Sequence, residues 1–116
     1  MTVHVRRVGD ATIIDVDGRI TEDSADILRA AVQPMVRQGR VKIVFNLQAV
    51  PYIDTAALGE IIRAHASATC QGGGLKLLNV PRRIHDLLLI TRLDSVFGQF
   101  DDETAALNSF GPIGLP

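Results

Sequence analysis

The sequence has one cysteine, no surplus of either charge and no long apolar run, and each of these features excludes a class of protein. Cys70 alone cannot form an internal disulfide framework or a multi-cysteine metal site. Twelve basic and thirteen acidic side chains give a formal net charge of −1, without the basic surplus of a nucleic-acid-binding domain. No apolar stretch approaches the roughly 20 residues that span a bilayer, and residues 1–7 lack a signal peptide's apolar region. We therefore expect a cytoplasmic protein that neither inserts into a membrane nor binds nucleic acid.

The length of 116 residues suits one domain, and a hydrophobic fraction of 47% supplies its core. Two β-prone runs, residues 3–8 and 11–16, are separated by Gly9 and Asp10, which predicts a hairpin. Helix-like and strand-like patterns then alternate along the chain. The predicted elements are a helix over 24–38, a strand over 42–47, a helix over 55–70, a strand over 75–80, a helix opened by Pro81, a short edge strand within 95–100 and a helical turn at 104–109.

This alternation predicts the fold class. It is α/β, with an N-terminal antiparallel hairpin followed by βαβαβα crossovers that build a mixed, largely parallel sheet. Each of the three main helices carries a single apolar stripe, so each can cover one face of the sheet. Pro34 lies inside the first helix, where we expect it to bend or shorten the helix.

Most of the residues that could take part in catalysis or metal binding have a structural explanation. His4, His65 and His85 lie on different predicted elements without metal-ligand spacing, and His65 is expected to be partly buried with its hydrogen bond satisfied. The glycines at 72–74 follow a helix and precede a strand, which is the place of a helix stop rather than a phosphate loop. Cys70 has no activating neighbour in the sequence. We predict no catalytic residue, no metal and no cofactor.

The junction at Asp54 and Thr55 is the most distinctive feature. A strand ends at Leu47, and these two residues fall where the second helix begins. They can serve as a helix cap, because their oxygens accept bonds from free amides of the first turn. A helix N-terminus also suits an anion, and a phosphate on a hydroxyl there adds about −1.5 to −2 charge. Both interpretations stay open at this point.

The order of elements, with Asp-Thr-Ala-Ala-Leu-Gly at residues 54–59, resembles a STAS domain, the fold of bacterial anti-sigma factor antagonists. Further matches over residues 3–107 are Gly18, the strand at 43–47, Gly-Gly-Leu-Lys-Leu at 73–77 and Leu-Asp-Ser-Val-Phe at 93–97. The resemblance implies helices packed mainly on one face of the sheet. We expect one STAS domain over residues 1–110, and the lack of periodicity in residues 111–116 predicts a loose tail there.

The resemblance further implies a partner-switching role in the bacterial cytoplasm. In that family an antagonist binds an anti-sigma factor that is a serine/threonine kinase. Phosphorylation at the start of the second helix breaks the complex, and a phosphatase restores it. The antagonist is the substrate of the kinase and not an enzyme, and we expect a monomer or a weak homodimer.

Carried onto this sequence, the family motif predicts a partner-binding surface and an acceptor. The surface is predicted to comprise Asp54, Thr55, Ala56, Ala57, Leu58 and Gly59. The usual motif resembles Asp-Ser-Ser-Gly-Leu-Gly, in which the hydroxyl of the second serine accepts the phosphoryl group. Ala56 stands at that position in this sequence. Ile53-Asp54-Thr55 is similar instead to the Ile-Asp-[Ser/Thr] of stressosome-type scaffold proteins, which makes Thr55 the predicted phosphorylation site. Thr21 and Asn46 stand where the family often carries acidic residues.

Two alternatives remain open. Ala56 and the missing acidic residues suit a non-switching scaffold, such as a stressosome component or the STAS subunit of a lipid-transport ABC complex. The second alternative is a small α/β enzyme that acts on a phosphorylated ligand at Asp54 and Thr55. The sequence offers no general base, nucleophile or metal cluster to accompany such a site.

Overall fold

A computed structural model describes residues 1–110 of the protein, and the predicted tail at 111–116 lies outside these residues. A five-stranded sheet forms its centre, with the strands side by side in chain order. The strands are β1 (Thr2–Val8), β2 (Ala11–Asp17), β3 (Lys42–Ala49), β4 (Gly74–Leu78) and β5 (Gly98–Phe100). β1 and β2 form the predicted antiparallel hairpin, in which Gly9 adopts a positive φ of 61°, and every other neighbouring pair is parallel. The predicted mixed sheet is confirmed.

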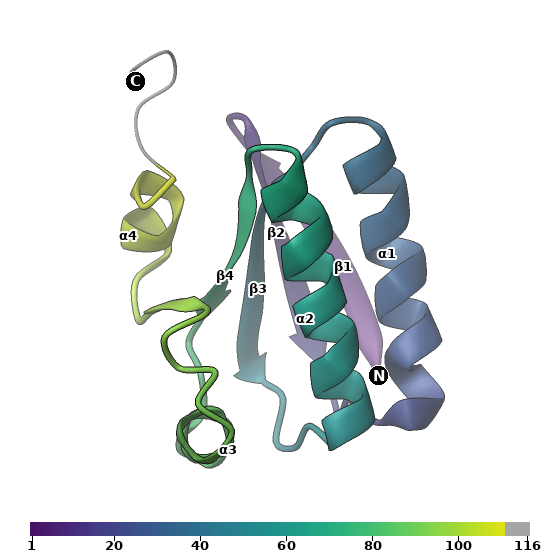
Figure 1. Cartoon of the computed structure of the whole chain (residues 1–116), viewed down its shortest axis with the longest axis vertical. Coiled ribbons are helices and arrows are strands. Elements are labelled where there is room, and N and C mark those ends of the chain that lie inside the picture. Colours follow the sequence, from purple (N-terminus) through teal and green to yellow (C-terminus); the bar gives the residue numbers. More distant parts are fainter. Residues whose placement is uncertain (111–116) are drawn as a thin grey trace.

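Within residues 1–110, four α-helices accompany the sheet (Figure 1). They are α1 (Ala25–Arg37), α2 (Thr55–Cys70), α3 (Arg82–Ile90) and α4 (Glu103–Asn108), and a 3₁₀ turn, η1 (Glu22–Ser24), leads into α1. Pro34 lies in the last turn of α1, so the helix continues past it only as far as Arg37. None of these helices, within residues 1–110, has the length and apolarity that crossing a bilayer requires.

The sheet has a large core on one face and a small one on the other. α1, α2 and α3 cover the first face, where Phe45 and Ile61 are almost fully buried. α4 covers part of the second face, where Ala106 packs against Ile13, Val44 and Leu78. The helices therefore pack mainly on one face, as predicted, and the last short helix is the exception.

One edge of the sheet brings together two loops that are distant in sequence. α1 follows β2 and α2 follows β3, and because these strands are parallel, both helices begin at the same edge (Figure 1). A bridge between Ile20 and Ile53 joins the two loops, with Ile20 N–H donating to Tyr52 O at 2.9 Å. Asp54 N–H donates in turn to Ile20 O at 3.1 Å. Both isoleucines are buried, so the start of α2 is held firmly beside the start of α1.

Candidate functional site

Asp54 caps two helices with one carboxylate. Its Oδ1 accepts a hydrogen bond from the Ala57 N–H in the first turn of α2, at 2.8 Å. Its Oδ2 accepts from the Glu22 N–H at the start of η1, also at 2.8 Å. The predicted cap is present, and the second bond adds a link across 32 residues of sequence. The carboxylate therefore fixes the position of α2 relative to the segment that opens α1.

Thr55 is the first residue of α2 and is exposed. Its hydroxyl makes no hydrogen bond to any other residue in the range 1–110. Asp54 supplies the cap, so the threonine oxygen is not needed to satisfy the helix amides. The structure thus presents a solvent-accessible hydroxyl on a rigid element, next to a carboxylate that is already engaged.

The six predicted surface residues divide between the surface and the core. Thr55 and Ala56 are exposed, and Asp54 and Gly59 are half-buried. Leu58 packs in the core at 5% exposure. Ala57 corrects the sequence prediction: it is fully buried, so it offers no surface to a partner. The reason is the helical period, which turns residues 57, 58 and 61 of α2 toward the sheet.

Gly59 is a glycine that the fold does not require. It has no positive φ, and a Cβ built at this position meets nothing within 4 Å. By contrast, a Cβ on Gly73 would collide with the backbone carbonyl oxygen of Val41, so packing demands glycine there. Glycine inside a helix costs roughly 0.5–1 kcal/mol relative to alanine. Gly59 therefore leaves a bare stretch of backbone on the exposed side of α2 at a cost in stability.

A hollow of about 500 Å³ lies beside this stretch, between the first turns of α1 and α2. It is lined by small or polar residues of both helices and by five charged side chains, which are Glu22, Asp26, Arg29, Glu60 and Arg63. Three carboxylates thus face two guanidinium groups.

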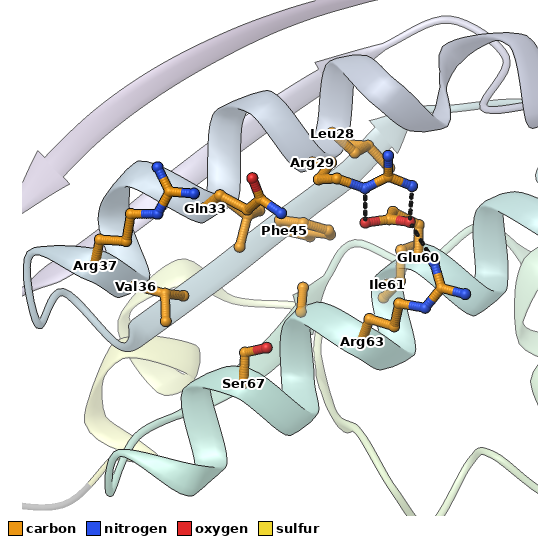
Figure 2. Close-up of a pocket in the computed structure, with 12 residues that line it drawn as sticks. Leu28, Arg29, Gln33, Val36, Arg37, Phe45, Glu60, Ile61, Arg63 and Ser67 are labelled. Carbon is orange, nitrogen blue, oxygen red and sulfur yellow. Dashed lines mark hydrogen bonds and ion pairs between the residues drawn. The ribbon is translucent and has the colours of Figure 1, made fainter.

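Glu60 is the buried charge of this hollow, and two arginines neutralise it (Figure 2). Arg29 of α1 donates from Nε to Oε1 at 3.1 Å and from Nη2 to Oε2 at 2.9 Å, and Arg63 donates to Oε2 at 3.3 Å. The hydrogen bonds from Arg29 lower the pKa of Glu60. This cluster joins α1 to α2, and it closes one end of a groove of about 410 Å³ between them. Sequence reasoning missed it, because Arg29 and Glu60 are 31 residues apart.

The remaining candidates take structural roles. His65 is partly buried and its Nδ1 accepts from the Leu75 N–H at 3.2 Å, as predicted; burial lowers its pKa. Gly72 has a positive φ of 87° where α2 ends, which confirms the helix stop. Asn46 donates to Asp15 at 2.8 Å. Within residues 1–110, no group of three or more His, Cys, Asp or Glu side chains is arranged to hold a metal ion.

A family model described as the STAS domain matches residues 2–106. The anti-sigma-B factor antagonist of Bacillus subtilis (strain 168) is 30% identical over 96 residues, which are 83% of this chain and 87% of that protein.

Solved structures extend the similarity to the fold. An anti-sigma-factor antagonist (STAS) domain protein from Planctomyces limnophilus has a TM-score of 0.84 at 16% identity, over 95% of this chain and 98% of its own. The Bacillus cell fate determinant SpoIIAA in its phosphorylated form has a TM-score of 0.75 at 16% identity, over 93% of this chain and 98% of its own. SpoIIAA in its unphosphorylated form has a TM-score of 0.74 at 16% identity, over 96% of this chain and 100% of its own.

Proposed function

The chain belongs to the STAS domain family, and from that premise we propose that it is an anti-sigma factor antagonist switched by phosphorylation of Thr55. In this proposal the protein acts in the bacterial cytoplasm and binds a serine/threonine kinase-type anti-sigma factor. A phosphatase reverses the modification. The observation that carries the proposal is the exposed hydroxyl of Thr55 at the first residue of α2, beside the Asp54 double cap.

The switching step is a phosphoryl transfer from ATP held by the kinase. The Thr55 Oγ1 attacks the γ-phosphorus, the bond between the γ-phosphorus and the β–γ bridging oxygen breaks, and ADP leaves. The hydroxyl proton passes to a base of the kinase. This chain supplies only the acceptor oxygen, so it is a substrate and catalyses no reaction itself.

In this proposal, the environment of Thr55 makes the modification release a partner. Ala56 and Gly59 carry little or no side chain, so a partner can approach the backbone of α2 closely. A phosphate adds about −1.5 to −2 charge beside Asp54 and the exposed Glu22. Burying such a group in a protein interface costs its hydration and adds repulsion from the carboxylates. The complex therefore weakens without any change of fold, in keeping with the similarity of this chain to both forms of SpoIIAA.

The test incubates the protein with a candidate serine/threonine kinase-type anti-sigma factor and ATP, and mass spectrometry identifies the product. We expect one phosphate on Thr55 and none on Thr55→Ala, whereas Thr69→Ala, a control at an exposed threonine near the other end of α2, stays modifiable. Phosphorylation should weaken binding of the anti-sigma factor at least tenfold. Modification elsewhere, with Thr55 untouched, would overturn the proposed switch.

A second candidate function is a non-switching scaffold or complex subunit. Ala56 at the usual acceptor register favours it, because no hydroxyl is present there. In that case the complex formed by this protein should be unaffected by kinase and ATP, and genes nearby should encode stressosome or transporter components.

A further inference from the structure

The groove between α1 and α2 has no part in the proposed switch. Its volume of about 410 Å³ lies within the roughly 300–1,000 Å³ typical of small-molecule sites. α2 lines it with the small side chains of Ala64 and Ser67, opposite Val32 and Val36 of α1. Because these α2 side chains are short, the two helices leave space between them, and Phe45 of β3 lies at the bottom of this space (Figure 2).

The groove is apolar along its floor and closed at one end. The residues of the floor are Leu28, Val32, Phe45, Ile61 and Ala64. At one end the cluster of Arg29, Glu60 and Arg63 bridges α1 and α2 (Figure 2). A peptide chain running through the groove would be blocked by this cluster. An alkyl tail suits the groove better, because such a tail can terminate there.

The rim of the groove carries one uncompensated positive charge. Its lining includes three arginines and one glutamate. Arg29 is bound to Glu60 and Asp26, and Arg63 is bound to Glu60, so these four side chains together are neutral. Arg37 is the remaining arginine; it is exposed, lies at the other end of the groove and takes part in no ion pair within residues 1–110 (Figure 2). A monoanion therefore complements the charge of this rim.

We propose that the groove binds a free amphiphilic monocarboxylate, with its unbranched alkyl chain on the apolar floor and its carboxylate on Arg37. A guanidinium binds a carboxylate in a forked, charge-assisted geometry, and the chain displaces water from the apolar floor. Arg29 and Arg37 are separated by eight residues of α1, about 12 Å along the helix axis. Extended decanoate has a similar length and is the probe that we choose.

The inference goes beyond the proposed function and does not depend on it. Neither Thr55 nor a protein partner takes part in binding the carboxylate. The cluster of Arg29, Glu60 and Arg63 nevertheless lines both the groove and the hollow beside Thr55. A bound amphiphile thus lies next to the surface at which the anti-sigma factor is proposed to dock.

The test titrates the isotope-labelled protein with decanoate, kept below the concentration at which it forms micelles, and follows amide and methyl NMR signals. We expect saturable shifts centred on Val32, Val36 and Ala64. Decyltrimethylammonium has the same chain and the opposite charge, and it should bind about tenfold more weakly or less. Acetate, which has the carboxylate without the chain, should give no saturable shifts.

Two pairs of variants locate the chain and the carboxylate. Ser67→Leu puts an apolar side chain into the groove and should weaken decanoate binding by about tenfold or more. Ala66→Leu, at the neighbouring exposed residue outside the groove, is its control and should leave the affinity unchanged. Arg37→Gln should weaken binding about two- to fivefold, as for loss of a solvent-exposed ion pair. Arg83→Gln makes the same change of charge on α3, away from the groove, and should have no effect.

Four results would overturn the inference. They are the absence of saturable shifts in the groove, equal binding of decyltrimethylammonium, unchanged affinity in Ser67→Leu, and equal losses in Arg37→Gln and Arg83→Gln. Groove signals that move when the protein alone is diluted would also overturn it, because a second copy of the chain would then be the occupant. Amide spectra of each variant establish that it is folded. No kinase or partner enters these measurements, so their failure leaves phosphorylation at Thr55 standing, and failure of the proposed switch leaves them intact.

Discussion

Replacing Asp54 with alanine removes two helix caps in one substitution. The Ala57 N–H and the Glu22 N–H both lose their carboxylate partner, each from a bond of 2.8 Å. Loss of one N-cap bond typically costs about 0.5–2 kcal/mol, and bonds to charged groups lie toward the upper end. We expect Asp54→Ala to lower the free energy of unfolding by about 2–3 kcal/mol, a large part of the roughly 5–15 kcal/mol typical of a domain.

The loss is measured by urea unfolding followed by circular dichroism, together with the melting temperature. For a domain of this length, 1 kcal/mol corresponds to about 4 °C, so the melting temperature should fall by about 8–12 °C. Asp54→Asn keeps one acceptor oxygen and should lose about half as much, because its amide nitrogen cannot accept the second bond.

Two variants calibrate the measurement. Asp102 caps α4 through a single bond to the Ala105 N–H at 3.0 Å, so Asp102→Ala should cost about 1 kcal/mol. Thr55→Ala removes an exposed hydroxyl and should change stability by no more than about 0.5 kcal/mol. If Asp54→Ala destabilised the protein no more than Asp102→Ala does, the double cap would be refuted as a stabilising feature.

Three further predictions concern stability. Arg29 lowers the pKa of Glu60, so the folded state binds the carboxyl proton of Glu60 less tightly than the unfolded state does. The resulting stabilisation is complete above about pH 4.3 and is lost in more acidic solution. Glu60→Gln should therefore flatten the acid side of a plot of unfolding free energy against pH. Burial lowers the pKa of His65, so stability should fall as the pH drops below about 6.5, and His65→Gln should remove that part of the profile measured between pH 7 and 5. Gly59→Ala should raise the free energy of unfolding by about 0.5–1 kcal/mol, whereas Gly73→Ala should lower it. Chemical denaturation of the two variants checks whether packing requires glycine at position 73 and not at position 59.

Local patterns in the sequence were sufficient for the elements and for the first cap. The hairpin at Gly9, the helix that starts at Thr55 and its stop at Gly72 all follow from interactions within a few residues. Burial of Ala57 was also within reach, because it stands one residue before Leu58 and four before Ile61 on the inward side of the helix.

What the sequence determined by itself was the order of strands and helices, the place of the carboxylate and hydroxyl at the start of α2, and the family, since each is encoded in short-range spacing. Only the tertiary structure decided that Asp54 also caps the segment at Glu22, and that Arg29 and Arg63 share Glu60. Asp54 and Glu22 are 32 residues apart, and Arg29 and Glu60 are 31 apart. Such contacts form because two parallel crossovers bring the starts of two helices to the same edge of the sheet. The local spacing of apolar residues cannot predict which helix starts become neighbours.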